Sequence, residues 1–155
     1  MKLLMVNAFY YPYIGGTEKH MYELSRRLAK WFEVHVLTSN WGKGEVEGVN
    51  IHRVPTQFLK MPLIYPPPLA VAKKKDIENI VRELKPDVVN LHGRFFPSFN
   101  IAFNIAENIG ATKVFTLHNA RPVGISFPIT LFGLTYDAFI GKRVLKRADK
   151  IIAVS

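Results

Sequence analysis

The chain has 155 residues, 48% of them hydrophobic, and no cysteine. This length favours one domain, and the composition excludes a disulfide scaffold, thiolate metal ligands and a disordered chain. The formal net charge of +9 favours anionic partners such as nucleotides, phosphates, nucleic acid or acidic lipid, without choosing between them. The opening MKLLMV is too short for a signal peptide, and no apolar run reaches the ~18 residues of a membrane span. We therefore expect a cytoplasmic domain.

Strand and helix patterns alternate along the first half of the chain. Residues 3–7 form a short apolar run that predicts a buried strand. From Thr17 apolar residues recur at three- and four-residue steps, which predicts a helix. Residues 33–38 and 49–54 are predicted strands, and the proline-rich residues 55–68 are predicted to have no regular structure.

The second half of the chain continues this alternation. Its predicted elements are a helix, a strand, a helix, a strand, a helix and a buried strand at residues 69–84, 87–92, 98–109, 112–118, 128–147 and 149–155. Strands that alternate with helices require right-handed crossovers, which predicts an α/β fold: a three-layer Rossmann-like domain with a mostly parallel sheet. Because the chain stops at a buried strand, we expect it to be part of a longer protein.

Ligands of such a sheet bind outside the carboxyl ends of its strands, near the point where the strand order reverses. The residues that follow the predicted strands are therefore the candidate site. They are Gly15 and Gly16 after the first strand, His92 and Arg94 after the fourth, and His118, Asn119 and Arg121 after the fifth.

The glycine pair Gly15-Gly16 allows two interpretations. Glycines at the start of a helix let an anionic ligand approach the backbone N–H groups. Alternatively, the pair forms a turn that merely needs a positive φ. Neither the G-x-G-x-x-G fingerprint nor the G-x-x-x-x-G-K-[ST] loop occurs here, which argues against a dinucleotide-binding or P-loop protein.

The five histidines differ in their predicted positions. His118 ends an apolar strand at the ligand-binding edge and is the preferred functional residue, while His92 has a weaker claim from the same placement. His20 faces either the cleft or solvent, and we favour a non-catalytic role; His35 and His52 lie within strands and are expected to be structural. No two histidines have the i,i+4 or short-loop spacing of metal ligands, so no metal site is expected.

Acidic and basic residues narrow the alternatives further. Asp87 and Asp149 open strands at the wrong edge, which weakens a phosphoacceptor domain or a paired-carboxylate hydrolase. The basic residues at 73–75 and 142–150 are most simply solvated helix faces. Each group also adjoins an apolar segment, so docking on an acidic membrane surface is the alternative.

Four segments of the chain form a familiar ordered set. FYYPYIGGTEKHMYELSRRLAKWFEVHVLTS, PDVVNLHG, TLHNA and ADKIIAVS together resemble the N-terminal domain of the retaining family 4 glycosyltransferases, which have the GT-B fold. That family includes sucrose-phosphate synthases, mannosyltransferases and many lipid and polysaccharide glycosyltransferases. The resemblance implies transfer of a hexose from a nucleotide sugar, such as a UDP- or GDP-sugar, to a glycan or lipid acceptor.

The same resemblance assigns roles to individual residues. Gly15 and Gly16 match the pair that lines the interdomain cleft near the donor diphosphate and the acceptor. His118 matches the histidine that contacts the transferred sugar near its anomeric carbon. His20 and the loop around His92 and Arg94 would flank the acceptor. Many members have Asp where Asn119 stands, so a charged role there is in doubt.

The family binds its nucleotide sugar mainly through a second Rossmann domain with two glutamates eight positions apart, a spacing that no two glutamates here have. By resemblance, residues 1–155 are the acceptor-side half, need a C-terminal donor-binding domain and are inactive alone. The alternative is a free-standing, non-catalytic ligand- or partner-binding module of the same fold. A nucleic-acid-binding domain has only the charge in its favour, and we expect no nucleic-acid partner.

Overall fold

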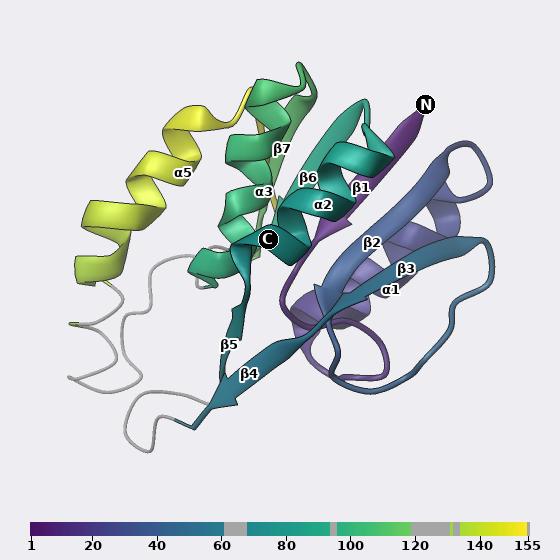
Figure 1. Cartoon of the computed structure of the whole chain (residues 1–155), viewed down its shortest axis with the longest axis horizontal. Coiled ribbons are helices and arrows are strands. Elements are labelled where there is room, and N and C mark those ends of the chain that lie inside the picture. The colour runs from purple at the N-terminus through teal and green to yellow at the C-terminus, as the bar shows by residue number, and fades with distance from the viewer. Residues whose placement is uncertain (61–67, 94–95, 119–130, 132–133, 155) are drawn as a thin grey trace.

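The computed structural model describes every residue except 61–67, 94–95, 119–130, 132–133 and 155 (Figure 1). Its main feature is a six-stranded sheet in the order β3-β2-β1-β6-β7-β8, in which every neighbouring pair is parallel. The strands are β1 (Lys2–Val6), β2 (Glu33–Ser39), β3 (Val49–Val54), β6 (Val88–His92), β7 (Thr112–Leu117) and β8 (Lys150–Ala153). The predicted α/β class with a parallel sheet is confirmed. The strand order reverses between β1 and β6, the point where such sheets bind ligands.

Helices cover both faces of the sheet and give the predicted three layers. In Figure 1, α1 (Gly16–Leu28) lies behind the sheet, while α2 (Lys74–Leu84) and α3 (Pro97–Asn108) lie in front. The side chains of β1 alternate between these faces, because successive residues of a strand point to opposite sides. Leu3 and Met5 pack with the α1 side, and Leu4 and Val6 pack with the α2 and α3 side.

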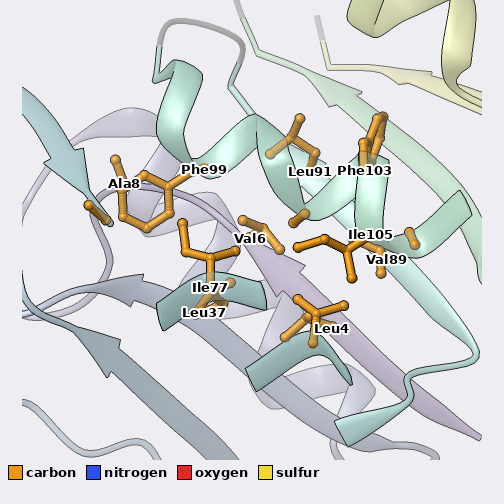
Figure 2. Close-up of a cluster of buried hydrophobic side chains, with 14 of the residues drawn as sticks. Leu4, Val6, Ala8, Leu37, Ile77, Val89, Leu91, Phe99, Phe103 and Ile105 are labelled. Carbon is orange, nitrogen blue, oxygen red and sulfur yellow. The ribbon is translucent and has the colours of Figure 1, made fainter. Parts of the chain in front are cut away.

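The larger part of the core lies between the sheet and the helices α2 and α3. Figure 2 shows strand residues such as Val6, Val89 and Leu91 together with Ile77 from α2 and Phe103 from α3. These side chains are at most 1% exposed. A strand covered on both faces must be apolar throughout, which explains why β1 and β6 read as continuous apolar runs.

A second, two-stranded antiparallel sheet lies beyond the carboxyl end of β3. It pairs β4 (Thr56–Leu59) with β5 (Leu69–Ala72), so the prediction of no regular structure was wrong for β4, and the helix predicted to begin at residue 69 begins at Lys74. Pro55 precedes β4 and needs no ladder hydrogen bond there. The LAVA sequence of β5 finds an extended partner in β4, and tertiary pairing overrides its helical pattern.

The last strand also departs from expectation. β8 was predicted to be buried, but its four residues are exposed, with Ile151 at 54% and Ile152 at 47%. It is an edge strand that pairs only with β7, so one side of it has no neighbour in this sheet. The helix predicted at residues 128–147 is described in part, as a π-helical segment (Asp137–Gly141) followed by α5 (Lys142–Arg147).

Candidate active site

The candidate site is built from the segments that follow β1, β6 and β7. Asn7 follows β1, His92 is the last residue of β6, and His118 follows β7 directly. Because the three strands are neighbours in a parallel sheet, their carboxyl ends meet at one edge. Helix α1 begins at the same edge, since it follows β1 in the chain. The predicted convergence of these segments is confirmed for the residues that the structure describes.

The start of α1 does not need glycine for its backbone conformation. Gly15 precedes the helix with an extended φ of −150°, and its carbonyl oxygen accepts a hydrogen bond of 2.9 Å from the Lys19 N–H. Neither Gly15 nor Gly16 has a positive φ, so the interpretation of the pair as a positive-φ turn was wrong. A Cβ added to Gly16 would find no heavy atom within 4 Å. The face of the helix start at Gly16 is therefore open.

Gly15 has a packing role that the sequence alone did not predict. A Cβ at this position would overlap Oε2 of Glu18, whose side chain folds back over the start of α1. Glu18 is 9% exposed, and its Oε1 accepts a 3.2 Å hydrogen bond from Nδ2 of Asn7. Burial raises the pKa of this carboxyl group. A glutamate three residues after the N-terminal capping residue is a known helix-start signal, and it could have identified Glu18.

Three histidines from three different elements meet at this edge. Nδ1 of His92 lies 3.0 Å from Nε2 of His118, and the ring of His20 stands edge-on to that of His118 at a centroid distance of 4.9 Å. His20 lies one turn after Gly16 in α1, so the two positions share a face of the helix. This contact settles the orientation of His20: it faces the histidine cluster.

Burial keeps the two strand-end histidines uncharged at neutral pH. His92 is fully buried, and its burial together with the nearby His118 and His20 holds the pKa of His92 well below its ordinary value. Burial, with a smaller contribution from His20, lowers the pKa of His118 to about 4. In such a neutral pair one ring donates its N–H to the lone pair of the other. His118 is thereby fixed in orientation and is a poor general acid at neutral pH.

The remaining predicted residues divide into two groups. Arg94, Asn119 and Arg121 lie outside the described residues. His35 and His52 lie within β2 and β3 and pair with each other, with Nδ1 of His35 2.9 Å from Nε2 of His52. Nε2 of His35 also lies 3.0 Å from Oε1 of Glu33, so this second pair is tied into the strands.

Spacing along the chain gave no reason to expect metal ligands, because it reveals only ligands that are close in sequence. The fold brings together one ring nitrogen each from His20, His92 and His118, and these nitrogens all lie within 4.8 Å of one another. Imidazole nitrogens at such distances are the kind of donor set that holds Zn²⁺. The cluster is therefore a candidate ligand set that only the three-dimensional structure reveals.

The family model of Glycosyltransferase Family 4 matches residues 14–155. The chain belongs to this family. An uncharacterized glycosyltransferase of Methanocaldococcus jannaschii is 30% identical to the family 4 chain over 156 residues, which cover all of this chain and 41% of the relative. A phosphatidylinositol N-acetylglucosaminyltransferase component of Arabidopsis thaliana is 30% identical over 125 residues, which cover 77% of this chain and 28% of that protein.

A solved structure supports the same fold for the family 4 chain. The crystal structure of MurG from Acinetobacter baumannii matches 99% of the chain with a TM-score of 0.59, at 14% sequence identity. The match covers 41% of the MurG chain, so the family 4 chain spans well under half the length of the proteins it resembles. Among the helices that the structure describes, none is long and apolar enough to cross a membrane.

Proposed function

We propose that residues 1–155 form the N-terminal, acceptor-side half of a retaining glycosyltransferase. The enzyme transfers a hexose from a UDP- or GDP-sugar to a glycan or lipid acceptor, and a C-terminal GT-B domain holds the donor. The observation that carries this proposal is the shared position of the open helix start at Gly16 and the uncharged His118, at the edge where the strand order reverses. Family membership and the relatives' greater length support it.

The start of α1 supplies the electrostatic part of the site. Its free N–H groups and the positive end of the helix dipole favour an anion such as a diphosphate. The open face at Gly16 lets such a group approach the backbone. The buried carboxyl of Glu18 lies beside this position, and its raised pKa lessens its repulsion of a phosphate because it holds a proton more readily.

His118 acts by position and hydrogen bonding in this proposal. A new bond forms between the acceptor oxygen and the anomeric carbon while the bond from that carbon to the phosphate oxygen breaks. The acceptor proton passes to the leaving phosphate, so no protein general acid is needed. His118, oriented by His92 at 3.0 Å, hydrogen-bonds the transferred sugar. Such pre-organised contacts stabilise the charge that develops in the transition state.

The test of this proposal compares two lengths of the protein. Residues 1–155 carry one wall of the cleft, so we expect negligible transfer from UDP- or GDP-sugars by this chain alone and measurable transfer by the chain continued into its donor domain. The anomeric configuration of the product would then be retained. Robust turnover by residues 1–155, or a coding frame that stops at codon 155 with no separate protein to supply the donor half, would contradict the proposal and favour a non-catalytic binding module.

The acceptor class follows from the surface around α5. Leu134 is 45% and Phe139 is 67% exposed, and Lys142 and Arg143 follow them with exposed side chains. Exposed apolar residues beside basic ones are typical of docking on anionic membranes. The Arabidopsis relative is named as a transferase of phosphatidylinositol. These observations support a lipid-linked acceptor and contact with the inner face of a membrane.

Liposome co-sedimentation tests this membrane contact. We expect the chain to sediment with anionic vesicles, and less with neutral ones. The double variant Leu134→Ser with Phe139→Ser should lose this binding. The control is Trp31→Ser, which removes an apolar side chain that is 79% exposed just beyond the far end of α1 and should bind as the parent does. Equal sedimentation of the double variant would rule out this surface.

A further inference from the structure

The cluster of His20, His92 and His118 has features beyond those that sugar transfer needs. Nδ1 of His20 and Nε2 of His92 are buried and have no hydrogen-bond partner among the residues that the structure describes. Buried ring nitrogens are normally paired, because an unpaired one loses the hydrogen bonds that water would give it. Two such nitrogens within one cluster indicate a site that takes a ligand rather than a fully satisfied structural network.

We propose that His20, His92 and His118 bind one divalent transition-metal ion of the Zn²⁺ class, each through one ring nitrogen. Their candidate ligand nitrogens already lie within 4.8 Å of one another, and no two of the residues come from the same element. The first comes from α1, the second from the end of β6 and the third from the residue after β7. Two of the three ligands are thus held by neighbouring strands of the sheet.

The distances suit such an ion after a small adjustment. Zn–N bonds of about 2.0–2.1 Å in a tetrahedral arrangement place two ligand nitrogens about 3.3 Å apart. The His92 and His118 nitrogens, at 3.0 Å, are already near this spacing. His20 must supply most of the remaining movement. Its side chain is only half-buried and stands on a helix, so rotation of the side chain can bring it in while the two strand-end histidines stay in place.

The donor set also selects the class of ion. Imidazole nitrogens suit Zn²⁺, Co²⁺, Ni²⁺ and Cu²⁺, whereas Mg²⁺ and Ca²⁺ prefer oxygen ligands. Three protein ligands leave a fourth position of a tetrahedral ion for water or another small ligand. A bound ion would occupy the His118 nitrogen, so metal and sugar would compete for it. This inference goes beyond the proposed function, and its test needs no transferase activity.

The test is a metal titration of the 155-residue chain after treatment with a chelator. We expect Co²⁺ to bind one-to-one with visible ligand-field absorption, and Zn²⁺ to displace it; excess Mg²⁺ should not. His20→Gln and His118→Gln should each weaken Co²⁺ binding by at least about 10- to 100-fold, since even the loss of a group that supports a ligand has an effect of this size. Two variants are used because either alone could perturb folding. Thermal unfolding in chelator identifies any variant that is not folded.

The second histidine pair provides the matched control. His52→Gln removes one member of the pair in β2 and β3, which has a similar nitrogen-to-nitrogen distance of 2.9 Å but no third histidine. This variant should bind Co²⁺ as the parent does. The proposal is overturned if the parent shows no saturable binding, if folded His20→Gln and His118→Gln variants bind unchanged, or if His52→Gln abolishes binding. None of these outcomes bears on sugar transfer, so the two proposals fail separately.

Discussion

The two glycines at the start of α1 make opposite predictions when each is changed to alanine. In Gly16→Ala the new Cβ meets no heavy atom within 4 Å, and Gly16 is already helical. Alanine also restricts the unfolded chain, which typically adds about 0.4–1 kcal/mol of stability where the native backbone conformation suits it. We therefore expect Gly16→Ala to unfold at the same temperature as the parent, or slightly above it.

Gly15→Ala should be clearly destabilising. Its Cβ would overlap Oε2 of Glu18, so that side chain must leave its place and lose the 3.2 Å hydrogen bond from Asn7. Asn7 keeps its 2.8 Å bond to the Phe9 carbonyl, so only one hydrogen bond of a buried group is lost. Such a loss costs about 1–2 kcal/mol. At this chain length that corresponds to a fall of about 2–8 °C in the unfolding midpoint.

The informative comparison joins stability with activity. Urea unfolding of each 155-residue variant gives the stability, and transfer by the same variants joined to the donor domain gives kcat/KM. If a ligand approaches over Gly16, the stable Gly16→Ala variant should still lose transfer, because its methyl group fills the open face. A Gly16→Ala variant as unstable as Gly15→Ala would show that Gly16 is structural. A stable and fully active one would show that no ligand lies there.

Three further predictions concern stability. Since the folded-state pKa of His118 is lowered from 6.5 to about 4, the unfolded chain takes up this proton first as pH falls. Its stabilising contribution should be complete above the unfolded pKa and lost toward the folded pKa, by about 1–2 kcal/mol after allowing for its half-exposed position, and urea titrations of His118→Gln should show a flatter profile. The pKa of Glu18 is raised from 4.5, so its ionised form costs stability as pH rises through that value; Glu18→Gln should remove this dependence while keeping an oxygen for Asn7, and an unchanged profile would refute its buried position. Leu91→Ala in the core should cost about 2–5 kcal/mol in urea unfolding, whereas Leu59→Ala, at 50% exposure, should change little.

The parallel sheet could be predicted because its strands carry their own signal. Strands β1 and β6 are buried on both faces, so residues such as Leu4 and Leu91 form apolar runs that helices at the surface do not show. The start of α1 was also close to its predicted position. The β4–β5 pair was missed because its stability comes from pairing between segments that are separate in sequence. Neither Thr56–Leu59 nor Leu69–Ala72 is distinctive alone.

The candidate site was predictable in position but not in composition. The rule that ligands bind at the carboxyl ends of strands placed His92 and His118 at one edge, and the structure brings them to 3.0 Å. The arrival of His20 from α1 depends on how that helix packs, which no spacing in the sequence encodes. Glu18 was overlooked because its importance comes from burial and from its position over Gly15.

The most direct test of the central claim is a kinetic comparison of His118→Gln with His52→Gln in the chain joined to its donor domain. Loss of one pre-organised hydrogen-bonding group typically lowers kcat by about 10²–10³-fold. We predict a loss of this size for His118→Gln at unchanged stability near neutral pH, and parent-like transfer by His52→Gln. Full activity of His118→Gln, or an equal loss in both variants, would contradict the placement of the site at the carboxyl ends of β6 and β7.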